Sequence, residues 1–409
     1  MSRAEDARGR RRFLSPRFVA GKVRQHGVVW CFRVFSQRVR GRAGRRVRTI
    51  ESGVSGRVRP LQAALWHLHD NMHQRDGKQP DVLYAFYDLA VSPATFDIVT
   101  FLVLAELERK KAGCRAMHVV IVPGTNEGFH EGGSPYGAEE KRWRLRNVLV
   151  PCCWLIPACQ QVTVCTSREE ARVFEASLVS CAYPWGYTVR FPKDGYTLRT
   201  VVTTSRETDL PSIHATSEAV RLLGDWINST SGGRKVVTIT LRECSYERDR
   251  NSDLEAWGAF ARGLDSTLFF PVVLRDTETA FEASPSSLDG LRVFPEVVWN
   301  IELRAALYEL SYLNLFMING PATLCIFNQR ARCISFQMIT PSCGATTEAH
   351  FRSAGLEPGS QFPWATPLQR IVWEADRLEV IEAAFGEMCE RIEGTSAEAP
   401  RVSGVMERS

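Results

Sequence analysis

Six short, largely apolar runs rich in β-branched residues constrain the fold of this chain more than any other feature. They are Val82–Val91, Met117–Val122, Val236–Leu241, Phe269–Leu274, Leu313–Ile318 and Cys333–Met338. Between them lie segments whose apolar residues step by three or four, as in Phe96, Val99, Val103 and Leu107, which is helical spacing. Buried strands that alternate with helices build parallel sheets. The chain is therefore predicted to be an α/β protein.

The length of 409 residues suits two Rossmann-like domains, each large enough for its own core. We predict a basic, disordered leader over 1–75 and Rossmann-like domains over 80–230 and 231–365. A helix over 366–393 and a disordered tail over 394–409 would follow. The helix is predicted near Pro367–Arg391 from one apolar stripe, made by Ile371, Leu378, Ile381, Phe385 and Met388.

Positive charge is concentrated at the N-terminus. Residues 1–60 hold 17 Lys+Arg against 3 Asp+Glu, whereas the remaining 349 residues hold 34 against 43. A mildly acidic body thus follows an Arg-rich leader, which argues against a generally basic nucleic-acid binder. The leader fits three interpretations: an extension without function, a basic amphipathic segment on anionic lipid, and a tail that binds nucleic acid non-specifically.

Neither a membrane span nor a metal site is predicted. No run of about 18 apolar residues occurs. The 12 cysteines are scattered, and the closest ones lack paired CxxC spacing, so we expect reduced and buried thiols at Cys152, Cys153, Cys159 and Cys165. We expect a cytoplasmic protein without metal or cofactor. Its leader would account for any peripheral contact with the inner face of the membrane.

Carboxylates in the N-terminal half mark one candidate site. Ligands of open α/β sheets bind beyond the carboxyl ends of the strands. That rule selects Asp88, at the end of the first strand, and Glu127, in the glycine-rich loop 124–137. Either carboxylate could serve as a general base. The alternative for Asp88 is a turn-forming residue at a strand end, and His130 in the same loop is expected to be solvated.

The C-terminal half carries the sharper signals. Arg242 follows directly on a buried strand and Arg250 lies in the next loop; arginine offers paired donors to phosphate oxygens. The run Asn319-Gly320-Pro321 follows another strand and precedes a helix. There, glycine lets the backbone approach a ligand and helix amides point at an anion. Together these features predict a diphosphate clamp, the alternatives being surface ion pairs and a simple Asn-Gly turn.

With these residues the sequence resembles the two-domain GT-B-type glycosyltransferases, most closely over Val236–Met338. The stretch Ile239-Thr240-Leu241-Arg242 is similar to the strand-plus-arginine element of fucosyltransferase-like enzymes, in which the arginine binds the donor pyrophosphate. The stretch Leu313–Pro321 is similar to a strand and small-residue loop shared with heptosyltransferase-like enzymes. The fucosyltransferase pattern has a His before the arginine and a second Arg after it, where this chain has Thr240 and Glu243.

The resemblance implies a glycosyltransferase of carbohydrate biosynthesis, which moves a sugar from a nucleotide-diphosphate donor to the hydroxyl of a glycan or other acceptor. The domains over 80–230 and 231–365 would bind acceptor and donor, facing a cleft, with the terminal helix crossing back to the N-terminal domain. Arg242, Arg250 and amides near Gly320 would stabilise the leaving diphosphate. They would replace a metal ion, since no DxD triplet occurs. The nucleoside would be contacted from the end of the next strand by Asp276, Thr277 and Glu278.

Two other functions fit the same pattern. A nucleotide-sugar epimerase or hydrolase would use the same two-domain fold. A non-catalytic nucleotide-sugar-binding protein is the alternative from another class, because fold alone does not imply function. A dinucleotide oxidoreductase is disfavoured, since no GxGxxG follows any predicted strand. Specific recognition of nucleic acid is not expected.

Overall fold

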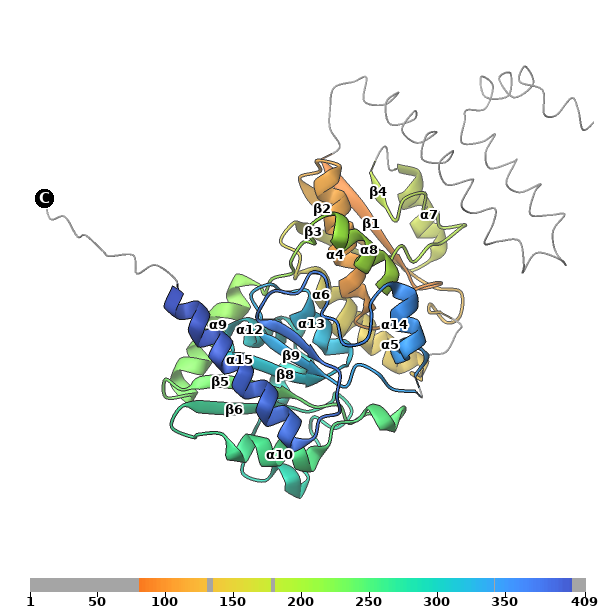
Figure 1. Ribbon diagram of the computed structural model, residues 1–409. Coiled ribbons are helices and arrows are strands. Elements are labelled where there is room, and N and C mark those ends of the chain that lie inside the picture. Colours follow the sequence, from red (N-terminus) through yellow and green to blue (C-terminus); the bar gives the residue numbers. More distant parts are fainter. Residues whose placement is uncertain (1–80, 131–134, 178–180, 342, 399–409) are drawn as a thin grey trace, which may run out of the picture. The chain divides into compact units, whose positions relative to one another are not determined.

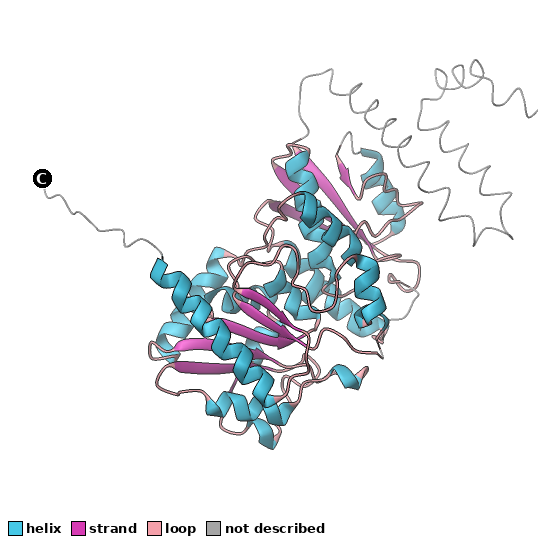
Figure 2. Cartoon of the chain, viewed as in Figure 1, coloured by secondary structure: helices cyan, strands magenta, loops and turns pink. Residues whose placement is uncertain are grey.

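The computed structural model describes residues 81–130, 135–177, 181–341 and 343–398, all within the unit Gln79–Ser409. The predicted leader and most of the predicted tail lie outside the described residues. The described strands form two sheets in which every pair is parallel, with helices packed on them (Figure 1, Figure 2). The prediction of an α/β fold with two Rossmann-like sheets is confirmed.

The first sheet has four strands in the order β3-β2-β1-β4. Its central strands are β1 (Val82–Asp88) and β2 (Ala116–Val122), and every residue of β2 is buried, which explains why these two sequences are almost wholly apolar. Its edges are β3 (Cys159–Val164) and β4 (Ala182–Tyr183). The strand order reverses between β1 and β4, because β2 and β3 lie on one side of β1 and β4 lies on the other.

Helices connect the strands of this half. The helix α4 (Asp97–Lys111) joins β1 to β2, and its residues from Ile98 to Leu107 are buried except Thr100. A continuous helical stretch joins β2 to β3, and its middle turn is a π-helix, η2 (Leu145–Leu149). The remaining helices are α5 (Ala138–Arg144), α6 (Val150–Cys153), α7 (Arg168–Ser177), α8 (Leu198–Glu207) and α9 (Ser217–Thr230).

The second sheet has six strands in the order β10-β9-β8-β5-β6-β7. Its strands are β5 (Lys235–Thr240), β6 (Phe269–Leu274), β7 (Arg292–Val293), β8 (Leu313–Met317), β9 (Cys333–Phe336) and β10 (Gln369–Val372). Counted from β5 as the first strand, the spatial order reads 3-2-1-4-5-6 from the β7 edge, which is the dinucleotide-binding order. The order reverses between β5 and β8.

The helices of this half alternate with its strands. They are α10 (Leu254–Gly263), α11 (Pro295–Trp299), α12 (Ile301–Leu310), α13 (Thr323–Ile326), α14 (Glu348–Ala354) and α15 (Leu378–Glu398). Short 3-10 turns lie at η3 (Arg248–Arg250), η4 (Ser286–Leu288), η5 (Gly320–Ala322) and η6 (Gly344–Thr346). None of the described helices is long and apolar enough to span a bilayer.

The predicted terminal helix differs from the structure at both ends. Gln369–Val372, which the pattern assigned to the helix, is the edge strand β10 and pairs with β9. Cys333–Met338 is therefore not the last strand. Ile371 fits the helical stripe only by coincidence of spacing, and β-branched Ile371 and Val372 suit a strand equally well. The helix begins at Leu378, and it continues past the predicted end at 393 to Glu398.

The C-terminal part packs in two places. The helix α15 lies across the second sheet (Figure 1). Its predicted stripe is buried at Ile381, Phe385 and Met388, within the apolar cluster of that sheet. A C-terminal helix does contact the N-terminal region, but it is α14, which contacts α8, whereas the helix predicted over 366–393 to cross back corresponds to α15, which packs on α10. A hydrogen bond of 2.6 Å from Arg206 Nη2 to the Gly355 carbonyl lies at that contact.

One apolar cluster joins the two halves. It contains Phe101 of α4, Leu307 of α12 and Leu324 of α13, all fully buried. Every cysteine among the described residues is a free thiol. The four that the sequence grouped, including Cys152 and Cys153, are buried small hydrophobic residues as expected.

Gly258 on α10 tests the packing of the second sheet. A Cβ there would lie 1.9 Å from the Ser287 carbonyl oxygen. Gly258→Ala should lower the free energy of unfolding by about 1–3 kcal/mol, because the helix must move away from η4. On α15, Gly386 has open space around its Cβ position, so Gly386→Ala should raise the same quantity by roughly 0.5–1 kcal/mol. Urea unfolding measures both; equal effects would contradict the described packing.

Candidate functional site

Each sheet has a switch point, where neighbouring strands send their connections in opposite directions. In the first sheet this point lies between β1 and β4, and in the second between β5 and β8. The two loops that leave β5 and β8 diverge there, and ligands of open α/β sheets bind in the resulting space. Arg242 follows β5 and Asn319 follows β8, so the residues selected from the sequence do lie at the switch point of the second sheet.

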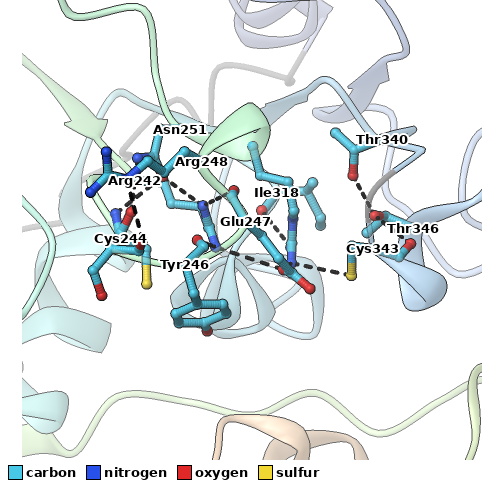
Figure 3. Close-up of polar contacts among 12 residues, drawn as sticks. Arg242, Cys244, Tyr246, Glu247, Arg248, Asn251, Ile318, Thr340, Cys343 and Thr346 are labelled. Carbon is cyan, nitrogen blue, oxygen red and sulfur yellow. Dashed lines mark hydrogen bonds and ion pairs between the residues drawn. The ribbon is translucent and has the colours of Figure 1, made fainter. Parts of the chain in front are cut away.

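Arg242 is the anchor of its own loop. Its side chain is 4% exposed. Nη1 donates to the Glu247 carbonyl at 2.9 Å and to Asn251 Oδ1 at 2.6 Å, and Nη2 donates to the Tyr246 carbonyl at 3.2 Å (Figure 3). Loop 243–251 is therefore wrapped around this guanidinium. Three of the five N–H donors of Arg242 are therefore committed to its own loop.

Arg250 bridges the two loops of the switch point. Nη1 lies 2.7 Å from Glu247 Oε2, and Nη2 donates to the Ile318 carbonyl, at the end of β8, at 3.2 Å. Nη1 also lies 3.5 Å from the buried thiol of Cys343. Its Nε is buried without a hydrogen-bond partner. Arg250 is thus held in place and retains an unused donor.

Glu247 is the carboxylate that faces these arginines. Its backbone is left-handed, with φ 49° and ψ 53°, a conformation that costs a non-glycine residue about 1–2 kcal/mol. Oε2 is 2.7 Å from Arg250 and 3.8 Å from Arg242. Two guanidinium groups share one carboxylate, so this cluster carries one net positive charge at the switch point. An anion would compete with Glu247 for Arg250.

The Asn319-Gly320-Pro321 turn has a different reason for its glycine than the sequence suggested. Asn319 caps the turn through Oδ1, which accepts from the Ala322 amide at 3.0 Å. A Cβ on Gly320 would lie 2.7 Å from Cδ2 of Phe96, the residue before α4. Glycine is required here by Phe96. The regular helix that follows, α13, has only 4 residues, so it offers a weaker array of amides than predicted.

The segment after β6 lies beside loop 243–251. Glu278 Oε2 accepts from the Ser245 amide at 3.1 Å, and Asp276 Oδ1 accepts weakly from the Glu278 amide at 3.4 Å. Thr277 is half-buried between them. The three predicted nucleoside contacts are therefore close to the arginine cluster. Their part in binding a nucleoside stays a prediction.

A buried ion pair that the sequence did not single out holds the same edge. Arg275, directly after β6, forms a two-pronged pair with Glu243, with Nη2 at 2.6 Å from Oε1 and Nε at 2.9 Å from Oε2. Both side chains are at most 10% exposed. Glu243 occupies the position where the fucosyltransferase pattern has a second Arg. Here it forms the ion pair that links the β5 and β6 loops.

Asp88 ends β1, and its carboxylate is fully engaged. Arg168 Nη1 and Nη2 donate to Oδ1 and Oδ2 at 2.8 and 3.0 Å, the Tyr187 hydroxyl donates to Oδ2 at 2.7 Å, and the Ala90 amide donates to Oδ1 at 2.9 Å. The residue is completely buried. The geometry favours a structural part, tying β1 to α7 and the loop of Tyr187. A role as general base stays a prediction that requires this pair to open.

Glu127, the other predicted base, is exposed. Its backbone has φ 48°, and its carboxylate lies 4.0 Å from Arg142, with both side chains more than half exposed. Exposed pairs at this distance hold a side chain weakly. Its role also stays a prediction.

Asp97, the first residue of α4, is the carboxylate that the sequence reasoning missed. It is exposed to solvent, yet surrounding protein atoms desolvate its carboxylate and raise its pKa, an effect that the Thr95 hydroxyl, donating at 2.6 Å, opposes in part. The residue before it, Phe96, contacts Gly320. Asp97 thus lies where the loop after β1 meets the loop after β8. The signal in the sequence was an acid in the first turn of the helix that follows a strand end.

Aromatic side chains line the approach to loop 243–251. The Tyr136 hydroxyl lies 2.8 Å from the Tyr246 hydroxyl, and the Arg144 guanidinium stacks 3.5 Å from the Tyr136 ring centroid. Beside Arg144, Trp143 contacts Trp299, with ring centroids 4.7 Å apart.

The same aromatic group continues to the surface. Phe281 lies 5.5 Å from Trp299 between ring centroids, and the two side chains are 68% and 39% exposed. Exposed aromatic faces of this kind are common in binding surfaces. No pattern in the sequence predicts this cluster, because Trp143, Phe281 and Trp299 come from three separate connections. Within the described ranges, no three or more His, Cys, Asp or Glu side chains are grouped so that they could hold a metal ion.

Comparisons with known proteins give matches in structure only. No protein-family model matches the chain, and no curated protein matches its sequence significantly. The structure is similar to that of a glycosyl transferase family 9 protein from Veillonella parvula DSM 2008, with 10% identity and a TM-score of 0.43 over 76% of this chain and 97% of that chain. It is also similar to the ADP-heptose LPS heptosyltransferase II of E. coli, with 8% identity and a TM-score of 0.44 over 76% and 99%.

A third similar structure is the wall teichoic acid polymerase TagF, with 9% identity and a TM-score of 0.27 over 81% of this chain and 87% of that chain. The first two are the kinds of enzyme that the sequence resembles. At such identities and TM-scores the likeness describes the arrangement of elements, so any case for a function rests on this chain's own residues.

Asp88→Asn distinguishes the structural part of Asp88 from a catalytic one. If the carboxylate serves to balance Arg168, the change should lower the free energy of unfolding by about 3–5 kcal/mol, because a largely buried guanidinium loses its partner. Glu169→Gln breaks the exposed pair with Arg172 and should cost about 0.2–1 kcal/mol. Urea unfolding measures both. A stable Asp88→Asn protein that has lost only an activity would instead support Asp88 as the base.

Proposed function

We propose that this chain is a glycosyltransferase, which moves a sugar from a nucleotide-diphosphate donor to a hydroxyl acceptor. Arginine and backbone amides, instead of a metal ion, would stabilise the negative charge of the leaving diphosphate. The observation that carries the proposal is the place of Arg250. It spans the loops of β5 and β8 at the switch point, and its partner Glu247 can be exchanged for an anion. Positive charge held in advance where negative charge develops is the most effective form of such catalysis.

The two arginines have different parts in this proposal. Arg242 keeps loop 243–251 closed through its bonds to Tyr246, Glu247 and Asn251. Arg250 turns from Glu247 to the diphosphate, and the Gly320 amide is the proposed backbone donor, since the Ala322 amide already donates to Asn319. Asp276, Thr277 and Glu278, next to that loop, are the proposed contacts to the nucleoside. This division retains every donor residue named from the sequence and assigns phosphate contact chiefly to Arg250.

Activation of the acceptor is the second part. Asp97 has the properties of a general base: water reaches it, its pKa is raised toward the range where a base works best, and it directly follows Phe96, which contacts Gly320. Asp88 and Glu127 are the alternatives, the first held by Arg168 and the second exposed. The exposed rings of Trp299 and Phe281, near loop 243–251, are the proposed platform for a glycan acceptor.

Arg250→Gln tests the donor site. Loss of a charge-assisted bond to phosphate should weaken binding of the cognate nucleoside diphosphate about tenfold or more. A thermal-shift screen of UDP, GDP, ADP and CDP with their sugars identifies that ligand in the unaltered protein, since binding to the folded state raises Tm. Calorimetric titration then gives the ratio of Kd values between variant and unaltered protein.

Arg221→Gln is the matched control, because Arg221 lies on α9 and is exposed beside Glu218. It should leave nucleotide affinity unchanged. The proposed donor site fails if no nucleoside diphosphate shifts Tm, or if Arg250→Gln binds as well as Arg221→Gln. Binding that depends on Arg250 without any transfer to a panel of acceptors would point to the non-catalytic sugar-nucleotide-binding alternative.

Asp97→Asn tests the base. Once a donor is known, the change should lower kcat at least a hundredfold and leave the Kd of the nucleoside diphosphate within about twofold, because the amide keeps the shape but cannot accept the proton. In the unaltered protein, kcat should fall as pH drops through the raised pKa of Asp97. A kcat that is insensitive to Asp97→Asn would transfer the role to Asp88 or Glu127.

The same variant has a predicted effect on stability. A carboxyl whose pKa is higher in the folded than in the unfolded state holds its proton more tightly when folded, so ionisation destabilises the protein as pH rises above about 3.9, the ordinary value. Asp97→Asn should therefore raise Tm at pH 7 relative to the unaltered protein. The difference should vanish near pH 3, where both states are protonated.

A further inference from the structure

A second cationic site lies at the opposite ends of the strands that form the switch point. A hollow of about 290 Å³ opens at the amino ends of β5, β8 and β9, and it is lined by Arg234, Lys235, Arg330 and Arg332 together with Glu309 and Tyr312. Lys235 is the first residue of β5, and Arg332 directly precedes β9. None of these residues belongs to the proposed donor site.

The lining carboxylate is already balanced. The Glu309 side chain is 6% exposed, and Oε1 accepts from the Ala215 amide at 2.6 Å and from Asn328 Nδ2 at 2.8 Å. Oε2 lies 3.5 Å from Arg330 Nη1. Glu309 therefore faces inward, toward α9 and the loop before β9, and offsets the charge of Arg330.

The remaining three cations have only one carboxylate among them. Lys235 Nζ lies 2.8 Å from Glu393 Oε1, at the rim on α15. No carboxylate of the described residues forms an ion pair within 4.0 Å of Arg234 or Arg332. The hollow thus carries a surplus of two positive charges, although the chain beyond residue 60 is acidic overall. The surplus is local and comes from the fold.

Contacts hold the guanidinium of Arg234, the ammonium of Lys235 and the backbone of Arg332 in position. Arg234 Nε donates to the Ser231 carbonyl at 2.6 Å, and its guanidinium carbon lies 4.7 Å from the Phe270 ring centroid. Lys235 Nζ lies 4.6 Å from the Tyr312 ring centroid. The Arg332 carbonyl accepts from the Asn314 side chain at 2.9 Å, which fixes the backbone of that arginine. Cationic side chains that are already held near one another need little rearrangement to bind an anion.

We infer that this hollow binds a small anion with a phosphate group of two negative charges, held by the guanidinium groups of Arg234 and Arg332. Paired N–H donors match phosphate oxygens, and two charges on the ligand neutralise the surplus. The volume lies at the lower end of small-molecule sites, so it suits a phosphate ester or headgroup and is small for a whole nucleotide sugar. The inference is independent of the proposed function, because it uses none of its residues.

The test uses the full chain and inorganic pyrophosphate as the probe. Pyrophosphate should slow hydrogen exchange of backbone amides in two segments, 231–236 and 329–333. Arg332→Gln and Arg234→Gln should each raise the pyrophosphate concentration needed for half-maximal protection about tenfold or more. Each variant removes one guanidinium whose charge no carboxylate balances, so both proteins should unfold as cooperatively as the unaltered chain.

Two controls separate this site from the donor site. Arg250→Gln should leave protection of 231–236 and 329–333 unchanged, even where it abolishes protection of loop 243–251. Arg352→Gln removes an exposed, paired arginine elsewhere and should change neither. The inference is overturned if millimolar pyrophosphate protects neither segment, or if protection is the same in Arg332→Gln, Arg234→Gln and the unaltered chain.

A second arm identifies the source of the phosphate. Vesicles of phosphatidylcholine that contain about 5% phosphatidylinositol phosphate are sedimented with the unaltered chain and with Arg332→Gln. A loss of sedimentation specific to Arg332→Gln, against Arg352→Gln, assigns the hollow to a lipid headgroup. Equal sedimentation of the two variants, together with protection by pyrophosphate, assigns it to a free phosphorylated molecule.

Discussion

The contact between Phe96 and Gly320 is the constraint on which the rest of the site depends. Phe96 precedes the first helix of the first sheet, and Gly320 follows the switch strand β8 of the second sheet. Because a Cβ at 320 would overlap the ring, a glycine is what allows the two loops to meet. Through this contact the loop that precedes Asp97 meets the loop after β8, whose Ile318 carbonyl accepts from Arg250. A single apolar cluster behind them, with Phe101 and Leu324 fully buried, supports it.

The arginines at the strand ends differ in role: Arg242 and Arg275 hold loops in place, whereas Arg250 has a partner that an anion can replace. Arg242 and Arg275 are almost wholly buried, and their donors are spent on loop carbonyls and on Glu243. Those bonds offset the cost of removing a guanidinium from water, and they fix the connections of β5 and β6. Arg250 is less buried and shares Glu247, a partner that an anion can replace. A rigid loop that carries one exchangeable arginine is what electrostatic stabilisation of a leaving group requires.

The sequence predicted the fold better than the site, for physical reasons. Buried parallel strands and the helix α4 have long apolar patterns that depend only on local composition, and they were found. The strand β10 was missed because four residues carry no period of their own and pairing with β9 decides their state. Arg242 and Gly320 were found by position, but their partners Asn251 and Phe96 could not be, since those contacts depend on tertiary packing. Asp97 escaped because an acid in a first helical turn is also what helix stability alone would select.

The strands β5 and β8 organise charge at both of their ends, and the two ends differ in kind. At the carboxyl end, Glu247 accompanies the arginines, so the net charge is small and an anion must displace a carboxylate; this suits the reversible binding that the proposed transferase reaction would require. At the amino end, no carboxylate in the described part of the chain pairs with Arg234 or Arg332, so an anion entering there would displace water. Weak competition makes such a site suited to steady occupancy and not to turnover. One sheet can therefore hold two phosphate-binding regions with opposite demands, because the ends of its strands are separated by the buried core between them.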